Sequence, residues 1–204
     1  MDTHAHWNRL YATKRDGDVS WFEALPEESI RMIEAAGLTA DTCVLDVGGG
    51  DSRLVDQLAG RGLTCLAVLD VSETALHRAQ ARLGPAAAPL VWIASDVTGA
   101  WALKPMDIWH DRAVFHFLVD GRDRARYLDH LRETLKVHGS AIIATFALDG
   151  PASCSGLPVA RYSPATLAAE LGGDFRLVES APHAHVTPWG STQSFQYSRF
   201  ERVH

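Results

Sequence analysis

The amino-acid sequence predicts a doubly wound α/β fold, in which helices cover both faces of a mostly parallel sheet. Short, nearly continuous apolar runs alternate with amphipathic stretches from residue 42 onward, as in parallel strands that are buried on both faces. A glycine turn, Gly48–Gly50, joins the first such run to the first helix. The chain closes with two strand-like runs joined by a loop, which predicts an antiparallel hairpin.

Each element of the core follows from its own pattern. The first strand ends in Asp46 and the glycine turn, and the second helix has Ser72 as its N-cap and Gly84 at its end. The predicted strands are residues 42–50, 63–70, 89–96, 106–111, 140–148, 174–181 and 193–203. The predicted helices between them are residues 51–62, 72–84, 122–139 and 163–173.

Residues 1–38 are expected to form a helical cap on a single domain of residues 1–204, whose core is residues 39–204. The stretches HWNRLYA and VSWFEALPEESIRMIEAAG predict two short helices. Two interpretations of their aromatic side chains stay open, core packing and a lid over the open edge of the sheet. These side chains are Trp7, Tyr11, Trp21 and Phe22.

Composition narrows the classes of partner. The chain has a net charge of −6 and no basic stripe, so nucleic acid is not expected as a partner. It has neither an apolar run long enough to span a membrane nor the apolar segment of a secretory signal, and we expect a cytoplasmic protein. Cys43 and Cys65 fall in apolar runs and are expected to be buried thiols, without a zinc ribbon or a disulfide framework.

The glycine turn places free backbone N–H groups at a helix N-terminus, which favours a charged ligand. A dinucleotide fingerprint requires a third glycine, but that register falls on Arg53. The stretch VLDVGGGDS instead resembles motif I of the class I S-adenosylmethionine-dependent methyltransferases. Asp46 matches the acidic residue of that motif, Gly48 and Gly50 match two of its glycines, and Ser52 replaces the third.

The resemblance covers residues 7–203. It implies a seven-stranded sheet with an antiparallel C-terminal hairpin, and S-adenosylmethionine as the cofactor. In this family, Asp70 would bind the ribose hydroxyls, Asp96 would lie near the adenine, and Trp7 and Tyr11 would pack over the methionine end. The residues that the resemblance assigns to the cofactor are Trp7, Tyr11, Trp21, Asp46, Gly48, Gly49, Gly50, Ser52, Asp70, Val71, Asp96 and Val97. A domain of this fold that has lost its ligand is the alternative.

The stretch WHDRAVFHF, residues 109–117, places polar groups at the carboxyl end of the fourth strand, where ligands bind in open α/β sheets. His110, Asp111 and His116 are the candidate catalytic residues, with a histidine as base and Asp111 orienting it or holding an amine. A metal site formed by these three is a weaker alternative that matches no known motif, and no metal is expected. A purely structural role, with Asp111 paired to Arg112, also remains open.

Two further segments are expected at the same edge. Residues 147–163 are too long and too rich in glycine and proline for a simple connection, and residues 182–190 bring two histidines and Trp189. Cys154 is expected to be the accessible cysteine. The candidate acceptor-binding residues are Arg112, Cys154, Arg161, Tyr162, His183 and His185.

Together, the pattern and the resemblance predict methyl transfer to a nitrogen, oxygen or sulfur atom by in-line displacement, most simply on a small molecule. The N-terminal aromatic element is also similar to that of eukaryotic lysine methyltransferases, so a protein lysine acceptor is the alternative. A non-catalytic protein that binds S-adenosylmethionine is a second alternative.

Overall fold

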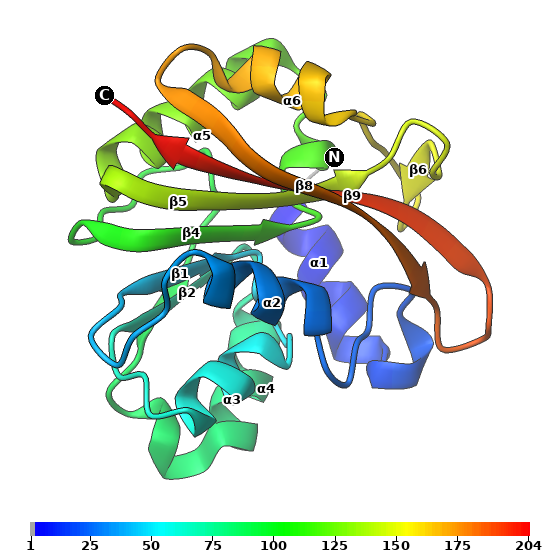
Figure 1. Cartoon of the computed structure of the whole chain (residues 1–204). Coiled ribbons are helices and arrows are strands. Elements are labelled where there is room, and N and C mark those ends of the chain that lie inside the picture. The colour runs from blue at the N-terminus through cyan, green and yellow to red at the C-terminus, as the bar shows by residue number, and fades with distance from the viewer. Residues whose placement is uncertain (1–2) are drawn as a thin grey trace.

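A computed structural model describes residues 3–204, so the first two residues of the predicted cap lie outside it. The strands form a seven-stranded sheet in the order β3-β2-β1-β4-β5-β9-β8, in which β9 alone runs opposite to the other strands (Figure 1). The predicted fold class is confirmed. The strands of this sheet are β1 (Val44–Val47), β2 (Leu66–Asp70), β3 (Val91–Ala94), β4 (Met106–Arg112), β5 (Leu135–Phe146), β8 (Phe175–Val186) and β9 (Thr192–Arg202).

Helices bury apolar side chains against both faces of the sheet. One face packs against Ile33 of α2, Leu58 of α3 and Leu76 of α4, and the other packs against Leu131 of α5 and Leu171 of α6. Burying large aliphatic and aromatic side chains in this way supplies most of the stability of such a domain. These helices are α2 (Glu27–Ala35), α3 (Leu54–Gly60), α4 (Glu73–Leu83), α5 (Gly121–Thr134) and α6 (Pro164–Leu171).

The remaining elements are short or lie at the rim. Helix α1 packs near α4 and precedes the turn η1, while η2 and η3 follow α4 and β4. The strands β6 and β7 form a separate two-stranded hairpin after β5. Their bounds are α1 (Thr3–Thr13), η1 (Asp16–Asp18), η2 (Gly84–Ala87), η3 (Phe115–Phe117), β6 (Ser153–Cys154) and β7 (Leu157–Pro158).

Three predicted boundaries are wrong. The helix predicted for 122–139 ends at Thr134, because Leu135 already pairs with Met106 across a bulge in the sheet. Residues 19–26, predicted as part of a helix, form a loop that carries Trp21 before α2 begins at Glu27. The histidines of the predicted 182–190 loop lie within β8, because that strand continues to Val186 in register with β9.

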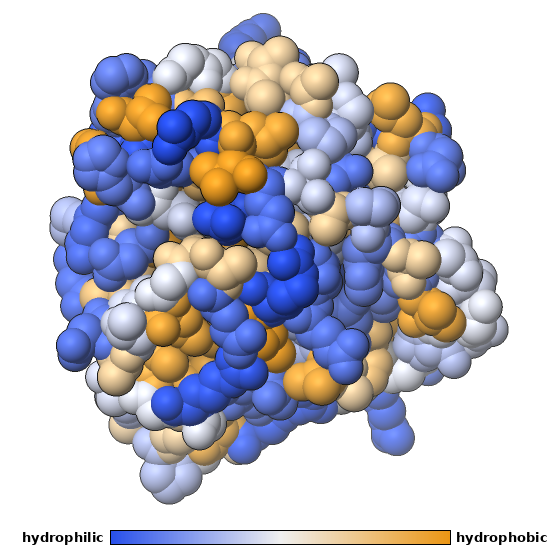
Figure 2. Space-filling view, in the orientation of Figure 1, coloured by the Kyte–Doolittle hydropathy of each residue, from blue (hydrophilic) through white to orange (hydrophobic). Residues whose placement is uncertain are grey.

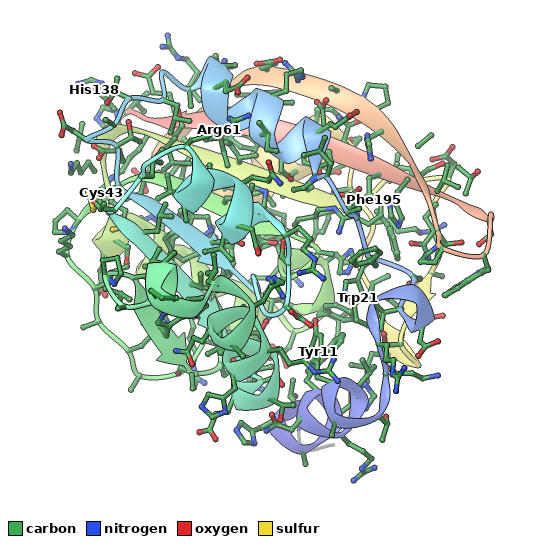
Figure 3. The ribbon with its side chains drawn as sticks, turned by 90° about the horizontal axis from the view of Figure 1, so that it is seen from below. Tyr11, Trp21, Cys43, Arg61, His138 and Phe195 are labelled. Carbon is green, nitrogen blue, oxygen red and sulfur yellow. A yellow bond between two sulfur atoms is a disulfide. The ribbon has the colours of Figure 1, made fainter. Side chains whose placement is uncertain are left out.

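The prediction for two of the cysteines is also wrong. Cys43 and Cys65 form a disulfide, with their Cα atoms 4.6 Å apart. Each directly precedes a strand, and Val44 pairs with Leu66, so the parallel pairing of β1 and β2 places the two residues side by side. The disulfide therefore joins the starts of two central strands, whereas Tyr11, Trp21 and Phe195 lie at the opposite end of the sheet (Figure 3).

The surface carries no large apolar area in the view of Figure 2, where apolar side chains form small groups among hydrophilic ones. Among residues 3–204, none of the helices combines the length and the hydropathy that crossing a bilayer requires.

Candidate functional site

The carboxyl end of β1 forms a turn that lacks room for side chains. Gly48 and Gly50 have φ angles of +65° and +44°, in the left-handed region that favours glycine. A Cβ atom at Gly48 would collide with the side chain of Val114, and one at Gly50 would lie 2.7 Å from Oδ2 of Asp70. The turn therefore needs glycine at both positions, and its backbone is open to a ligand.

Beside this turn lies a cavity of about 330 Å³, which we call the rim cavity. One end is formed by the carboxyl ends of β2 and β3, including Asp70 and Asp96, and the other end by aromatic and aliphatic side chains. Helix α1 and the β6–β7 hairpin supply further walls. The apolar end is lined by Trp21, Phe117, Phe146, Leu157, Pro158 and Phe195.

Asp70 is 6% exposed at the end of β2. Its Oδ1 accepts a hydrogen bond of 2.7 Å from the backbone N–H of Ser72, while Oδ2 accepts from no residue in 3–204. Burial raises the pKa of Asp70 to about 7, against the effect of the Ser72 N–H, and the negative charge of Asp46 adds to the rise. A buried carboxylate with a free oxygen suits a ligand that brings hydroxyl groups, because these donate to the charged form.

Asp46 stands at the end of a buried polar chain. The Nδ1–H of His110 donates to Oδ1 of Asp46 over 2.7 Å, because a carboxylate only accepts. Nε2 of His110 is hydrogen-bonded to the Ser29 hydroxyl at 2.9 Å, and that hydroxyl lies 3.1 Å from the Tyr197 hydroxyl. Oδ2 of Asp46 is buried and has no partner among the described residues. The chain leaves one carboxylate atom without a hydrogen bond beside the glycine turn, in the second and smaller cavity, where Gly49 and Ser52 also lie.

Three other residues that the sequence assigned to the cofactor, Val71, Asp96 and Val97, line the rim cavity. Asp96 accepts hydrogen bonds from the backbone and hydroxyl of Thr98, and its neighbour Val97 is buried. Val71 follows Asp70 in the cavity wall. The sequence-predicted set thus converges on one rim, with Asp46, Gly49 and Ser52 behind the glycine turn.

The N-terminal aromatic residues form a cluster over the rim cavity. The ring of Trp7 packs edge to face against Trp21 at 5.7 Å and against Phe117 at 5.5 Å. Tyr11 packs on Trp21 at 6.2 Å, and all four of these rings line the rim cavity. Phe22 borders the smaller cavity instead. The sequence left two interpretations of these residues open, core packing and a lid. Trp7, Tyr11 and Trp21 fit a lid, because they line the cavity and are partly exposed.

Asp111 lies away from the cavity. It is fully buried, and its carboxylate accepts from the Val114 and Phe115 N–H groups and from the Tyr127 hydroxyl at 2.7 Å. Burial raises the pKa of Asp111 to about 6 despite these bonds. Both oxygens are occupied, so Asp111 shapes the turn after β4 and does not face the cavity as the sequence predicts.

Neither candidate histidine offers a lone pair to a ligand. His110 uses both ring nitrogens within the chain described above. Nδ1 of His116 accepts from the Phe146 N–H at 3.3 Å, and Nε2 is buried without a partner among residues 3–204. Burial, with the nearby charge of Arg112, lowers the pKa of His116 to about 3, so the ring is neutral. His110, Asp111 and His116 therefore do not assemble into the metal site considered from the sequence.

Arg112 points toward the N-terminal loop instead of pairing with Asp111. Its guanidinium donates to the Trp21 carbonyl at 3.0 Å and to Oε1 of Glu23 at 2.9 Å, and it lies 5.0 Å over the Phe195 ring. It borders both cavities. Arg112 thus fastens residues 19–26 to the sheet.

The three acceptor-binding residues predicted in residues 147–163 do not lie together in the structure. Cys154 lines the rim cavity but is only 9% exposed, and burial raises the pKa of its thiol, so it is not the accessible cysteine that was expected. Arg161 is exposed and donates to the Gly150 carbonyl. Tyr162 is buried against Phe115 in the core. Neither Arg161 nor Tyr162 lines the cavity.

His183 and His185 contact Glu23 instead of the rim cavity, and Trp189 is 59% exposed at the tip of the β8–β9 hairpin. Burial opposes ionisation of Glu23, but the two histidines beside it and the charge of Arg112 hold its pKa well below the usual range. This polar group packs the loop 19–26 against β8.

Sequence reasoning missed three contributors to the site. Oδ1 of Asn8 accepts from the Ser72 hydroxyl at 2.9 Å and from the Thr74 N–H at 3.2 Å, which fastens α1 to the start of α4. Ala113 follows β4 with a φ of +73°, a strained conformation for a residue with a side chain, and lines the cavity. Phe195 comes from the last strand. Asn8 is a polar residue in the middle of α1, next to Trp7, and this position was a signal in the sequence, whereas the roles of Ala113 and Phe195 depend on tertiary packing.

Comparison with known proteins adds independent findings. Residues 44–139 match the family model of a methyltransferase domain. Among solved structures, the chain is similar to the N-methyltransferase NodS from Bradyrhizobium japonicum WM9 in complex with S-adenosylhomocysteine, at 19% identity, a TM-score of 0.76 and coverage of 100% of both chains.

A second solved structure is the 1,6-didemethyltoxoflavin-N1-methyltransferase of Burkholderia thailandensis, bound to 1,6-didemethyltoxoflavin and S-adenosylhomocysteine. It is 19% identical with a TM-score of 0.77, over 98% of this chain and 87% of that one. A third, an S-adenosylmethionine-dependent methyltransferase from Anabaena variabilis ATCC 29413, is 12% identical with a TM-score of 0.77, over 99% and 96% of the two chains. Among curated proteins, no match was found.

Proposed function

We propose that the chain is a class I S-adenosylmethionine-dependent methyltransferase, as its methyltransferase-domain match and its fold support, and that it methylates a small, largely apolar molecule bound in the rim cavity. The observation that carries this proposal is the cavity itself. It runs continuously from the aspartates at the ends of β2 and β3 to a cluster of aromatic side chains under α1. A cofactor bound at the aspartates and an acceptor bound among the aromatic side chains would meet between the two ends of the cavity.

The residues present fit the cofactor. When bound, S-adenosylmethionine supplies a methyl group activated by a positively charged sulfur. Oδ2 of Asp70 is free to accept from a ribose diol, and Asp96 and Val97 would border the adenine. The glycine turn and the orphaned Oδ2 of Asp46 offer backbone N–H groups and one acceptor for the amino-acid end. His110 is a positioning residue here, since its Nδ1–H holds Asp46.

The apolar end of the rim cavity sets the chemistry of the acceptor. Its walls are aromatic and aliphatic side chains, and the guanidinium of Arg112 is already engaged by Glu23 and Trp21. An acceptor with a flat, uncharged skeleton fits such walls through stacking and area burial. The solved neighbours include a 1,6-didemethyltoxoflavin-N1-methyltransferase and a glycopeptide N-methyltransferase, which supports a small-molecule acceptor.

The acceptor would bring its own lone pair. Within residues 3–204 no histidine or glutamate lines the rim cavity. Its carboxylates are Asp70 and Asp96, which the proposal assigns to the cofactor, and Asp123 in the first turn of α5, while the thiol of Cys154 and the hydroxyl of Tyr11 have raised pKa values. A general base contributes only where its free lone pair reaches the proton. We therefore propose an amine or ring nitrogen in its neutral form, or a sulfur, as the atom methylated, with orientation as the main catalytic contribution.

Tritium transfer tests the proposal. The purified protein is incubated with S-adenosylmethionine labelled in the methyl group and a cell lysate, and the products are separated by dialysis. Label in the dialysable fraction is expected. Label in a protein band would favour a lysine acceptor instead, and cofactor binding without any transferred label would favour a non-catalytic binder.

The missing base has a test of its own. Once an acceptor is found, the pH profile of turnover should follow the pKa of the acceptor. His116→Gln should leave that profile unchanged, because the lone pair of His116 is already used within the protein. A titration near pH 6.5 that disappears in His116→Gln would contradict the proposed acceptor chemistry while leaving methyl transfer itself intact.

A further inference from the structure

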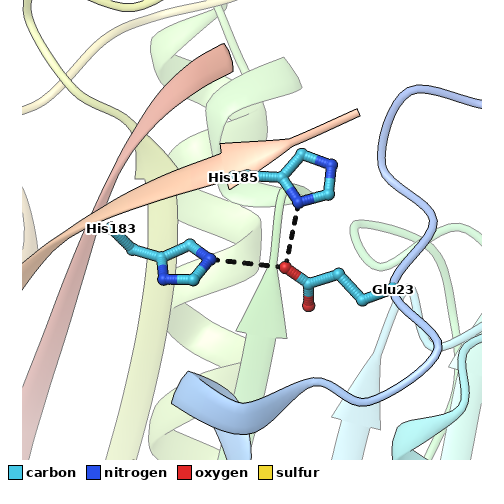
Figure 4. Close-up of side chains that lie close together, drawn as sticks. All are labelled: Glu23, His183 and His185. Atoms are coloured by element: carbon cyan, nitrogen blue, oxygen red, sulfur yellow. Dashed lines mark hydrogen bonds and ion pairs between the residues drawn. The ribbon is translucent and has the colours of Figure 1, made fainter. Parts of the chain in front are cut away.

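Three side chains from distant parts of the chain converge where the loop 19–26 meets β8, and one of them, Glu23, lines the smaller cavity. Glu23 lies in the loop before α2, and His183 and His185 lie two positions apart on β8, so their side chains point to the same face of the strand (Figure 4). Nδ1 of His185 is 3.1 Å from Oε1 of Glu23, and Nε2 of His183 is 3.4 Å from the same oxygen. All three candidate ligand atoms lie within 4.8 Å of one another.

The hydrogen bonds of His185 fix the direction of its lone pair. Its Nε2 lies against the backbone carbonyl of Ser20, and a carbonyl only accepts, so the proton of the neutral ring is on Nε2. Nδ1 then presents a lone pair to the carboxylate of Glu23, which is also an acceptor. Two acceptors 3.1 Å apart repel each other. The guanidinium of Arg112 already lies 2.9 Å from Oε1 of Glu23, and a second proton on the ring or a metal ion would fill the space between the two acceptors.

The arrangement has the form of a metal site with its supporting hydrogen bonds. Histidine ligands of metals usually donate their other ring N–H to a carbonyl or carboxylate, as His185 does to Ser20. With metal–ligand bonds of about 2.0 to 2.2 Å, neighbouring tetrahedral ligand atoms are about 3.3 Å apart. The measured separations from Oε1 of Glu23, 3.1 and 3.4 Å, lie on either side of that value.

We propose that Glu23, His183 and His185 bind a divalent transition metal ion, with zinc as the representative. Two imidazoles and one carboxylate suit zinc and its first-row neighbours, and they leave a coordination position open for water. That position is accessible because the His183 side chain is 28% exposed, whereas that of His185 is 2% exposed. The guanidinium of Arg112 lies 2.9 Å from Oε1 of Glu23. It would stay hydrogen-bonded to this carboxylate without contacting the metal itself.

A metal here would act on the wall of the rim cavity. It would join the loop 19–26 to the edge strand β8, and this loop carries Trp21, which packs on Trp7 and lines the cavity. Residues 19–26 are otherwise held to the sheet through Arg112 and the histidine contacts. Occupancy would thus stabilise the closed position of Trp21.

Zinc titration of chelator-treated protein tests the site. Calorimetry should show one tight Zn²⁺ ion per chain, and the midpoint of thermal unfolding should rise with zinc, because a ligand of the folded state stabilises it. His185→Ala and His183→Gln should each weaken Zn²⁺ binding by more than about tenfold and abolish the thermal shift. His77→Ala, which removes an exposed histidine on α4, is the matched control and should bind zinc as the wild type does.

Equal zinc affinity in the wild type, His183→Gln and His185→Ala would overturn the proposal and would leave a second proton on His185 as the charge between the acceptors. Because His183 is partly exposed, His183→Gln keeps the test valid if the buried His185→Ala variant unfolds. The readouts are bound metal and thermal stability, so the result is independent of whether the small-molecule acceptor is correct.

Discussion

Two buried carboxylates at the same edge of the sheet behave in opposite ways. Asp70, at the end of β2, uses one oxygen for the Ser72 N–H and leaves Oδ2 facing the glycine turn. Asp111, at the end of β4, has both oxygens occupied by two backbone N–H groups and the Tyr127 hydroxyl. An acceptor left open at a rim indicates a ligand, whereas a saturated one indicates structure, although the sequence pattern is the same at both.

The largest effect is expected from removing Asp70, the carboxylate with an open oxygen. Asp70→Ala removes the acceptor proposed for the ribose diol, and the loss of two hydrogen bonds to a charged group, about 4 kcal/mol, should weaken S-adenosylmethionine binding roughly a thousandfold. Calorimetric titration measures it. Wild-type affinity in Asp70→Ala would mean that the cofactor does not contact this carboxylate.

Removing Asp111, the carboxylate whose oxygens are both occupied, should lower the stability of the fold. Asp111→Ala leaves the proton of the Tyr127 hydroxyl and two N–H groups without acceptors, although the Tyr127 oxygen still accepts from Trp109, and we expect the free energy of unfolding to fall by about 3 kcal/mol. Urea denaturation measures this loss. The affinity of the folded fraction for S-adenosylmethionine should stay within about twofold of wild type; a large loss of affinity at full stability would instead place Asp111 at the ligand.

The pH dependence of stability sharpens the role of Asp70. Because the pKa of Asp70 is raised to about 7 in the folded protein, its contribution is greatest at low pH and is lost as the pH rises from about 4 to about 7. Asp70→Asn lacks this titration. Relative to that variant, the wild type should lose about 2 kcal/mol between pH 5 and pH 7. Parallel stability curves for the two proteins would show that Asp70 titrates normally.

A smaller effect is expected at the glycine turn. Gly50→Ala introduces a Cβ atom 2.7 Å from Oδ2 of Asp70 at a φ of +44°, which displaces the carboxylate without removing it. We expect about a tenfold loss of cofactor affinity, equivalent to about 1.4 kcal/mol. Gly60→Ala in α3, where a Cβ atom meets nothing within 4 Å, is the control that should bind normally.

The smallest effect is expected at Arg161. The sequence suggests that it binds the acceptor, but its side chain is exposed and donates only to the Gly150 carbonyl among the described residues. Arg161→Ala should change the KM for the acceptor by less than about twofold. A tenfold rise in that KM would show that residues 148–162 close over the acceptor in the complex.

The sequence was sufficient for what local periodicity and strand ends determine. The alternation of apolar runs predicts the sheet, and Asp46, Asp70 and Asp96 follow from their positions at successive strand ends. The Cys43–Cys65 disulfide was not predicted, because it depends on the exact starts of β1 and β2 and on their pairing side by side.

What could not be read depends on contacts between distant segments. Glu23 and His185 are 162 residues apart, and they meet only because β8 extends five residues beyond its predicted end at residue 181. The saturation of Asp111 likewise depends on Tyr127 from α5 and on the turn after β4. Periodicity assigns a residue to a face, but it does not say which neighbour will take its lone pairs.

The attachment of α1 through Asn8 has a kinetic consequence. Asn8 accepts from Ser72 and Thr74, and the backbone of Ser72 donates to Asp70. A molecule that binds Asp70 would therefore contact the same hydrogen-bonded chain that holds α1 over the cavity. Substrates should add in a compulsory sequence, with S-adenosylmethionine first and the acceptor second, and S-adenosylhomocysteine should leave last.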